Sequence, residues 1–113
     1  MINWIESMKV SDLDRGTAKS VMLEHGQTKQ RIRVALFNLD GEYFALEDVC
    51  THDGGEIANG CIFGETIECP RHGARFDIKS GKIVSPPATE PIQVVSLRVE
   101  GNSIYLREDW WNS

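Results

Sequence analysis

The sequence predicts an all-β protein, a sandwich or small barrel of short antiparallel strands. Apolar and polar residues alternate with a period of two along most of the chain, as in strands that bury one face. Turn-forming pairs such as Asp40-Gly41 and Ser80-Gly81 separate these runs. No repeat or low-complexity tract divides the 113 residues, so we expect a single domain spanning 1–113.

Two hairpins are the best-defined predicted elements. Each joins two alternating runs through a short segment with a glycine, Gly41 in one case and Gly101 in the other. The hairpins join 31–37 to 43–46 and 95–99 to 104–106. Ile32, Val34 and Leu36 fall on one face of the first. Shorter strands are predicted at 4–10, 18–24, 66–69, 76–78 and 82–84, and one helical turn at 11–15.

Charge and composition exclude several kinds of partner. The net charge is −5 and the pI is near 5.1, whereas binding to nucleic acid needs a cationic face. No segment approaches the roughly 20 apolar residues that cross a bilayer, and the first residues lack the features of a secretory signal. The three cysteines are an odd number, and two of them have a better use than a disulfide. We therefore expect a cytoplasmic protein with neither nucleic acid nor a membrane as partner.

Two short motifs carry the chemistry. They are Cys50-Thr51-His52 and, after sixteen intervening residues, Cys69-Pro70-Arg71-His72. Each pairs one thiol with one imidazole, and the chain has only one further cysteine and one further histidine. Both motifs fall between predicted strands, in loops at about 50–64 and 69–76. Two thiols and two imidazoles on such loops predict a metal site.

Several metal centres suit this ligand set. A Cys₂His₂ zinc site has the right donors, but zinc fingers usually place both thiols in one loop and both imidazoles in the other. Mononuclear iron or copper does not require mixed pairs. A two-iron, two-sulfide cluster offers a reason for them: if the thiolates hold one iron and the imidazoles the other, each loop contacts both irons.

The motifs resemble the signature of the Rieske [2Fe–2S] family, Cys-x-His followed by Cys-x-x-His. The resemblance extends from about Ala35 to the last predicted hairpin, and 85–87 resembles the proline loop that covers the cluster in that family. It implies one Rieske [2Fe–2S] cluster and stacked antiparallel sheets with a two-loop cluster-binding subdomain. It also implies a role for each ligand: Cys50 and Cys69 bind the inner iron, and His52 and His72 bind the outer iron.

Departures from the respiratory and photosynthetic branch of this family are informative. That branch has a disulfide between the loops, and Gly55 and Arg71 stand where its two cysteines would be. It also has serine and tyrosine hydroxyls that donate to the cluster sulfurs, where this chain has Ala74 and Phe76. Hydrogen bonds to sulfur stabilise the reduced cluster, so we expect a potential near the low end of the Rieske range of about −150 to +300 mV.

The chain therefore looks like a bacterial Rieske-type ferredoxin of a ring-hydroxylating dioxygenase system. The resemblance implies an electron carrier rather than an enzyme, working between an NAD(P)H-dependent flavoprotein reductase and a terminal oxygenase. One alternative is the small Rieske subunit of an assimilatory nitrite reductase. Another is a zinc-binding interaction module without redox chemistry.

The remaining unusual residues receive structural interpretations. We expect Cys61 to be a small buried side chain, His25 to be a solvated loop residue, and the tryptophans at 110–111 to pack on the sheet or form a tail. Four charged residues near the motifs are candidates for docking partners: Asp53, Glu56, Arg71 and Arg75.

Overall fold

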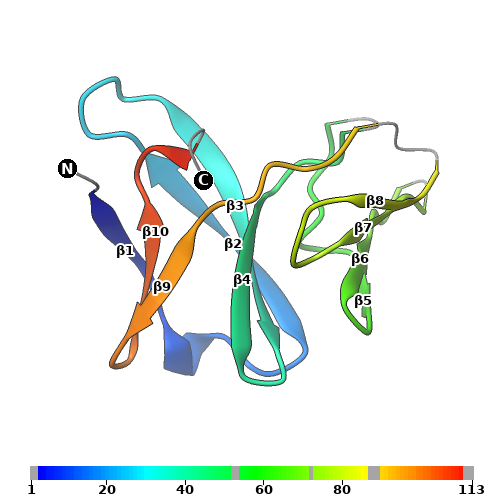
Figure 1. Ribbon diagram of the computed structural model, residues 1–113, viewed down its shortest axis with the longest axis horizontal. Helices are drawn as coiled ribbons and strands as arrows, with labels where there is room; N and C mark the ends of the chain where they lie inside the picture. Colours follow the sequence, from blue (N-terminus) through cyan, green and yellow to red (C-terminus); the bar gives the residue numbers. More distant parts are fainter. Residues whose placement is uncertain (1–2, 52–53, 72, 87–89, 111–113) are drawn as a thin grey trace.

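The computed structural model describes residues 3–51, 54–71, 73–86 and 90–110, which form ten strands and one short 3-10 helix (Figure 1). The strands are β1 (Trp4–Lys9), β2 (Thr17–Glu24), β3 (Arg31–Leu39), β4 (Glu42–Glu47), β5 (Cys61–Phe63), β6 (Thr66–Glu68), β7 (Arg75–Asp77), β8 (Ile83–Ser85), β9 (Leu97–Glu100) and β10 (Ser103–Arg107). The helix η1 is Val10–Asp12. The prediction of an all-β fold is confirmed.

The strands form three antiparallel sheets, ordered β1-β10-β9, β2-β3-β4 and β5-β6-β7-β8. Figure 1 shows the first two sheets side by side and the third set apart beyond β4. We call the first two sheets the base, and the described residues of 50–92, which carry the third sheet, the lobe. The chain enters the lobe from β4 and leaves it toward β9, so the lobe is an insertion into the base.

The fold has two apolar cores, and β3 contributes to both. The base core contains Leu13, Leu23, Val34, Leu36, Ala45, Val95, Ile104, Leu106 and Trp110. The lobe core contains Ala35, Phe37, Leu46, Cys50, Ile57, Ile67, Cys69, Ala74, Phe76, Ile78 and Ile92. Successive strand residues point to opposite faces, so alternate residues of β3 enter opposite cores. The predicted apolar face is confirmed, and the other face of β3 is also buried.

Both predicted hairpins are confirmed, with one shift in position. β3 pairs with β4 and β9 pairs with β10. The expected strand at 95–99 begins only at Leu97, because the residues before it pair with β4 instead. Val95 N–H donates to the Ala45 carbonyl at 3.0 Å, and Val94 forms a bridge with Leu46. This pairing holds the segment that leaves the lobe against β4, the strand that leads into the lobe.

β5 was not predicted, and the expectation for Cys61 is wrong. Cys61 opens β5 at the edge of the lobe sheet, where its side chain is exposed. The strand has only three residues and one partner, β6, so it leaves little periodic signal in the sequence.

His25 is not the solvated loop residue that we expected. Its side chain is only 13% exposed, its ring meets that of Trp110 edge-on with centroids 6.5 Å apart, and Trp110 itself is buried in the base core. The backbone N–H groups of Gln27 and Thr28 both donate to His25 Nδ1 at 3.2 Å. The imidazole thus stabilises the β2–β3 turn by accepting hydrogen bonds from its backbone.

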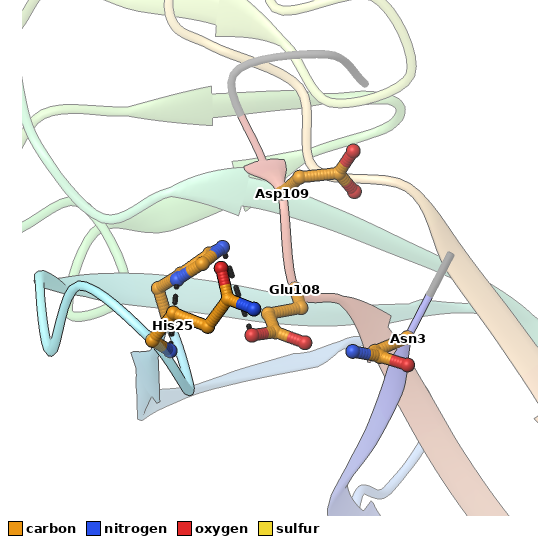
Figure 2. Close-up of a pocket in the computed structure, with 5 residues that line it drawn as sticks. Asn3, His25, Glu108 and Asp109 are labelled. Atoms are coloured by element: carbon orange, nitrogen blue, oxygen red, sulfur yellow. Dashed lines mark hydrogen bonds and ion pairs between the residues drawn. The ribbon is translucent and has the colours of Figure 1, made fainter. Parts of the chain in front are cut away.

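Figure 2 shows the His25 ring directed toward the Glu108 carboxylate, with Nε2 and Oε1 3.6 Å apart. Gly26 N–H donates to the same Oε1 at 2.6 Å, and Glu108 N–H donates to the Asn3 carbonyl at 2.9 Å. The Gly26 N–H, the Asn3 side chain and the nearby His25 together hold the pKa of Glu108 below its ordinary value. We call these four residues the terminal clasp, since they join the start of β1, the β2–β3 turn and the end of β10.

The described chain contains no helix long and apolar enough to cross a membrane.

Candidate metal centre

Cys50 begins the first ligand loop with its side chain fully buried. Its N–H donates to the Gly55 carbonyl at 2.6 Å, and its own carbonyl accepts from Gly54 N–H at 2.7 Å. Gly54 has a φ of +77°, a conformation that residues with a Cβ rarely adopt. The two hydrogen bonds close a tight backbone turn at this predicted thiol ligand.

The second loop repeats this arrangement around Cys69, whose side chain is 1% exposed. Cys69 N–H donates to the Ala74 carbonyl at 2.7 Å, and Gly73 N–H donates to the Cys69 carbonyl at 3.1 Å. Gly73 has a φ of +78°. In both loops the cysteine bonds the residues four and five positions later, and the fourth is a glycine in the left-handed region. The backbones of the two loops are thus matched, although the motifs differ in length.

The two thiols share one apolar environment. Cys50 and Cys69 both belong to the lobe core, together with Ala74 and Phe76, which are fully buried. No disulfide forms among the three cysteines, all of which lie in the described chain. The side chains of Ala74 and Phe76 contain no hydroxyl, so neither can donate a hydrogen bond to a sulfur atom in this core.

Two polar contacts that the sequence did not predict hold the first loop in place. The buried Asp48 side chain accepts the backbone N–H groups of Ile57 and Ala58 with Oδ1, at 2.7 and 2.9 Å. Thr51 Oγ1 donates to the carbonyl of Glu90 at 2.6 Å. Asp and Thr beside a ligand are common loop residues, and nothing in the sequence identifies the distant backbone that each one bonds.

Glu47 lies where β4 leads toward the first loop. Burial raises the pKa of this carboxyl above its ordinary value, because desolvation disfavours the charged form. Its N–H donates to the Gln93 carbonyl at 2.9 Å, so it lies where the chain enters and leaves the lobe.

Half of the predicted ligand set lies outside the described chain. His52 and His72 are not among the described residues, and neither is Pro87 of the predicted proline loop. Within the ranges given above, no three His, Cys, Asp or Glu side chains form a group that could hold a metal ion. The structure therefore places both predicted thiol ligands in matched, buried positions, and the whole ligand set remains a prediction.

The candidate docking charges differ in their surroundings. Arg75 Nε is 2.9 Å from a Glu68 carboxylate oxygen, and its guanidinium lies 4.3 Å from the centre of the Phe63 ring. Glu56 lies 3.5 Å from Arg33. Each of these two charges has a partner of opposite charge within the chain. Arg71 is exposed, and Asp53 lies outside the described residues.

The donor chemistry fits an iron–sulfur centre. Thiolates are the ligands such centres need, and the structure places two buried thiols, on matched loops, in one core. The chain belongs to the Rieske [2Fe–2S] domain family, whose model matches residues 3–96. One Rieske [2Fe–2S] cluster is the cofactor that defines this family.

Relatives narrow this class to the Rieske ferredoxins of bacterial aromatic-ring dioxygenase systems. The chain is 32% identical over 105 residues to the ferredoxin component of the naphthalene 1,2-dioxygenase system of Pseudomonas putida, covering 93% of this chain and 95% of that one. The solved Sphingomonas yanoikuyae B1 ferredoxin is 30% identical, with a TM-score of 0.81 over 93% of this chain and 98% of that one. A chain in the complex of reduced oxygenase and oxidized ferredoxin in carbazole 1,9a-dioxygenase is 28% identical, with a TM-score of 0.80 and 93% of both chains covered.

The fold is also similar to that of a protein outside the dioxygenase systems. A structure described as an NADH-dependent nitrite reductase small subunit from Mycobacterium tuberculosis has a TM-score of 0.80 at 23% identity, covering 95% of this chain and 96% of that one. At this identity the likeness concerns the fold alone.

Proposed function

We propose that this chain is the ferredoxin component of a bacterial aromatic-ring-hydroxylating oxygenase system. In this role it accepts one electron from an NAD(P)H-dependent flavoprotein reductase and passes it to a terminal oxygenase. The observation that carries the proposal is the pair of buried thiols, Cys50 and Cys69, at equivalent positions of two matched loops. The 32% identity with a naphthalene dioxygenase ferredoxin over most of both chains supports the choice of system.

We assign Cys50 and Cys69 to one iron, and His52 and His72 to the other. When bound, a Rieske cluster takes up and releases a single electron. The chain's own contribution is to hold the thiols in a buried apolar core and to keep the two loops in fixed conformations. A fixed ligand geometry lowers the reorganisation energy of each electron transfer.

The three cysteines provide a matched test of the thiol assignment. Cys50→Ala and Cys69→Ala are expected to lose bound iron, acid-labile sulfide and visible absorption. Cys61→Ala should retain all three, because Cys61 is exposed on β5. A loaded Cys50→Ala protein, or a purified wild type with zinc and no sulfide, would contradict the assignment and favour the zinc module.

The three histidines provide the same test for the imidazoles. His52→Gln and His72→Gln are expected to lose the cluster or its Rieske spectrum, and His25→Gln should retain both, since His25 belongs to the terminal clasp. Retention of the Rieske spectrum by His72→Gln would require a different ligand set.

The electron-transfer role is tested by reconstitution. With dioxygen present, NADH, a flavoprotein reductase, this protein and a terminal aromatic-ring oxygenase should together hydroxylate substrate, and omission of this protein should stop hydroxylation. The nitrite reductase alternative rests on a likeness of fold only. It would be favoured if the protein failed in this assay but restored nitrite reduction to a large subunit that lacked its small one.

The apolar surroundings of the thiols support a low reduction potential. Ala74 and Phe76 cannot donate hydrogen bonds to sulfur, and such bonds favour the reduced state. We expect a midpoint in the lower half of the Rieske range of about −150 to +300 mV. A dye-coupled titration followed by visible absorption measures it directly, and a midpoint above the middle of that range would contradict this part of the proposal.

Arg71 is our candidate for partner docking, because it is exposed and lies between the ligand motif residues Pro70 and His72. Transient electron-transfer interfaces are small and depend on electrostatic steering. We expect Arg71→Ala to lower the rate of electron transfer with at least one partner several-fold at low salt, while iron content stays the same. A matched Arg98→Ala change on β9 in the base should leave the rate unchanged. Parallel loss of iron and rate in Arg71→Ala would point to a structural role instead.

A further inference from the structure

Asp48 is a buried carboxyl group beside the metal centre that the ligand assignment does not use. It lies two residues before Cys50 and is 1% exposed. Its backbone N–H donates to the Arg33 carbonyl at 2.7 Å, which fixes it against β3. Charged side chains are rarely buried to this extent without a partner of opposite charge, so its presence here requires a reason.

One oxygen of Asp48 organises the first ligand loop. Oδ1 accepts N–H groups from two successive residues, Ile57 and Ala58, and Ile57 belongs to the lobe core that contains both thiols. The loop from Cys50 to Ile57 is therefore held at both ends, by the turn at Cys50 and by Asp48.

The other oxygen, Oδ2, is buried and has no hydrogen-bond partner among the described residues. The contact of Asp48 with the loop therefore depends on Oδ1 alone, so a side chain with one acceptor oxygen at this position is enough to make it.

We propose that Asp48 is a positioning residue for the first ligand loop. By holding the backbone of Ile57 and Ala58, it keeps the loop that begins at Cys50 in the conformation that binds the metal centre. This inference rests on the proposed function, since it requires a metal centre at Cys50 and Cys69.

Two substitutions of Asp48 and one control test this role. Asn keeps an acceptor oxygen for the Ile57 and Ala58 N–H groups, so Asp48→Asn should bind iron and sulfide in full and release iron to a chelator at the wild-type rate. Asp48→Ala removes the acceptor and should release iron at least threefold faster than wild type. Glu56→Gln is the matched control, a carboxylate of the same loop with a side chain 42% exposed, and its rate of iron release should equal that of wild type.

The outcomes distinguish this inference from the proposed function. A wild type without acid-labile sulfide overturns the proposed function and, with it, this inference. An Asp48→Asn protein that fails to bind the cluster, or an Asp48→Ala protein that retains it as wild type does, overturns the positioning role.

Discussion

At the scale of single residues, the ligand motifs contain more than ligands. Thr51 lies between Cys50 and His52, and its hydroxyl bonds the carbonyl of Glu90 in the segment that leads back to the base. This bond joins the first ligand loop to a part of the chain 39 residues later. The residue between two predicted ligands thus connects the candidate site to the return segment.

Thr51→Val keeps the shape of the side chain and removes this hydrogen bond. We expect a loss of about 0.5–1.5 kcal/mol in unfolding free energy and faster loss of iron to a chelator, because the return segment is no longer tied to the loop. Thr17→Val is the matched control, since Thr17 also donates to a backbone carbonyl at 2.6 Å, but in the base. Urea unfolding and the kinetics of bleaching measure both effects, and equal rates of iron loss in the two variants would contradict the prediction.

Glu108 makes the stability of the base depend on pH. The Gly26 N–H, the Asn3 side chain and His25 lower its pKa in the folded state from an ordinary value of 4.5. A lowered pKa means that the ionised group stabilises the fold above its unfolded pKa, and that this contribution is lost as the pH falls through the folded value.

We therefore expect Glu108→Gln to be less stable than wild type at pH 7, and the difference to shrink as the pH falls below about 4.5. Urea unfolding of both proteins between pH 7 and pH 4 measures the difference in their unfolding free energies. Acid removes the cluster from both proteins alike, so this loss largely cancels from the difference. Glu100→Gln, at an exposed pair with Arg98, should give a small difference at every pH. A Glu108→Gln difference that grew on acidification would have the wrong sign for this argument.

At the scale of elements, the two ligand loops are coupled through a close backbone contact. A Cβ on Gly60 would lie 1.8 Å from the carbonyl oxygen of Glu68, the last residue of β6. Glu68 directly precedes Cys69, so the end of the first loop packs against the start of the second. Only glycine permits this approach.

Gly60→Ala is expected to push β6 away and cost about 1–3 kcal/mol, with lower iron content because Cys69 moves with Glu68. Gly101→Ala is the control: its φ of +58° strains the β9–β10 turn, but a Cβ there has nothing within 4 Å. It should lose stability while it retains the full iron content. Thermal unfolding and iron analysis compare the two, and full iron in Gly60→Ala would show that the loops move independently.

The long elements could be predicted from the sequence, and the short ones could not. β3, β4 and β10 have alternation over several residues, which sets both the strand and its buried face. β5 has three residues and an exposed cysteine, so no periodic pattern identifies it. β9 begins at Leu97 and not at Val95 as predicted, because Val95 pairs with Ala45. These two residues are 50 positions apart, so the local sequence pattern does not reveal the contact.

Site prediction followed the same division. Cys50 and Cys69 were identified from local spacing, and the structure buries both. Asp48, Thr51 and Gly60 could not be identified from the sequence. Each contacts a backbone group elsewhere in the chain, and because every residue has a backbone, the residue types do not reveal which group is contacted. His25 was misjudged for the related reason that Glu108 lies at the other end of the chain.

At the scale of the whole molecule, the two cores differ in how they are held. The base has strands of four to nine residues, whereas each strand of the lobe sheet has three. Short strands contribute little by themselves. Two of the buried members of the lobe core are the thiols, so a bound metal centre would join the two ligand loops across that core. The base core contains no cysteine.

Removal of the metal should therefore unfold the lobe before the base. In apo-protein, backbone amides of β6 and β7 are expected to exchange with deuterium at least tenfold faster than in the loaded protein, because the lobe opens locally. Amides of β3 and β10 should change less than twofold, since their partners lie within the base. Hydrogen exchange with mass spectrometry at neutral pH measures both regions in one sample, and Trp110 in the base core offers a fluorescence check on the base. If exchange rose equally in all three sheets, the two cores would form one cooperative unit, and the lobe would not be the part whose stability depends on the metal.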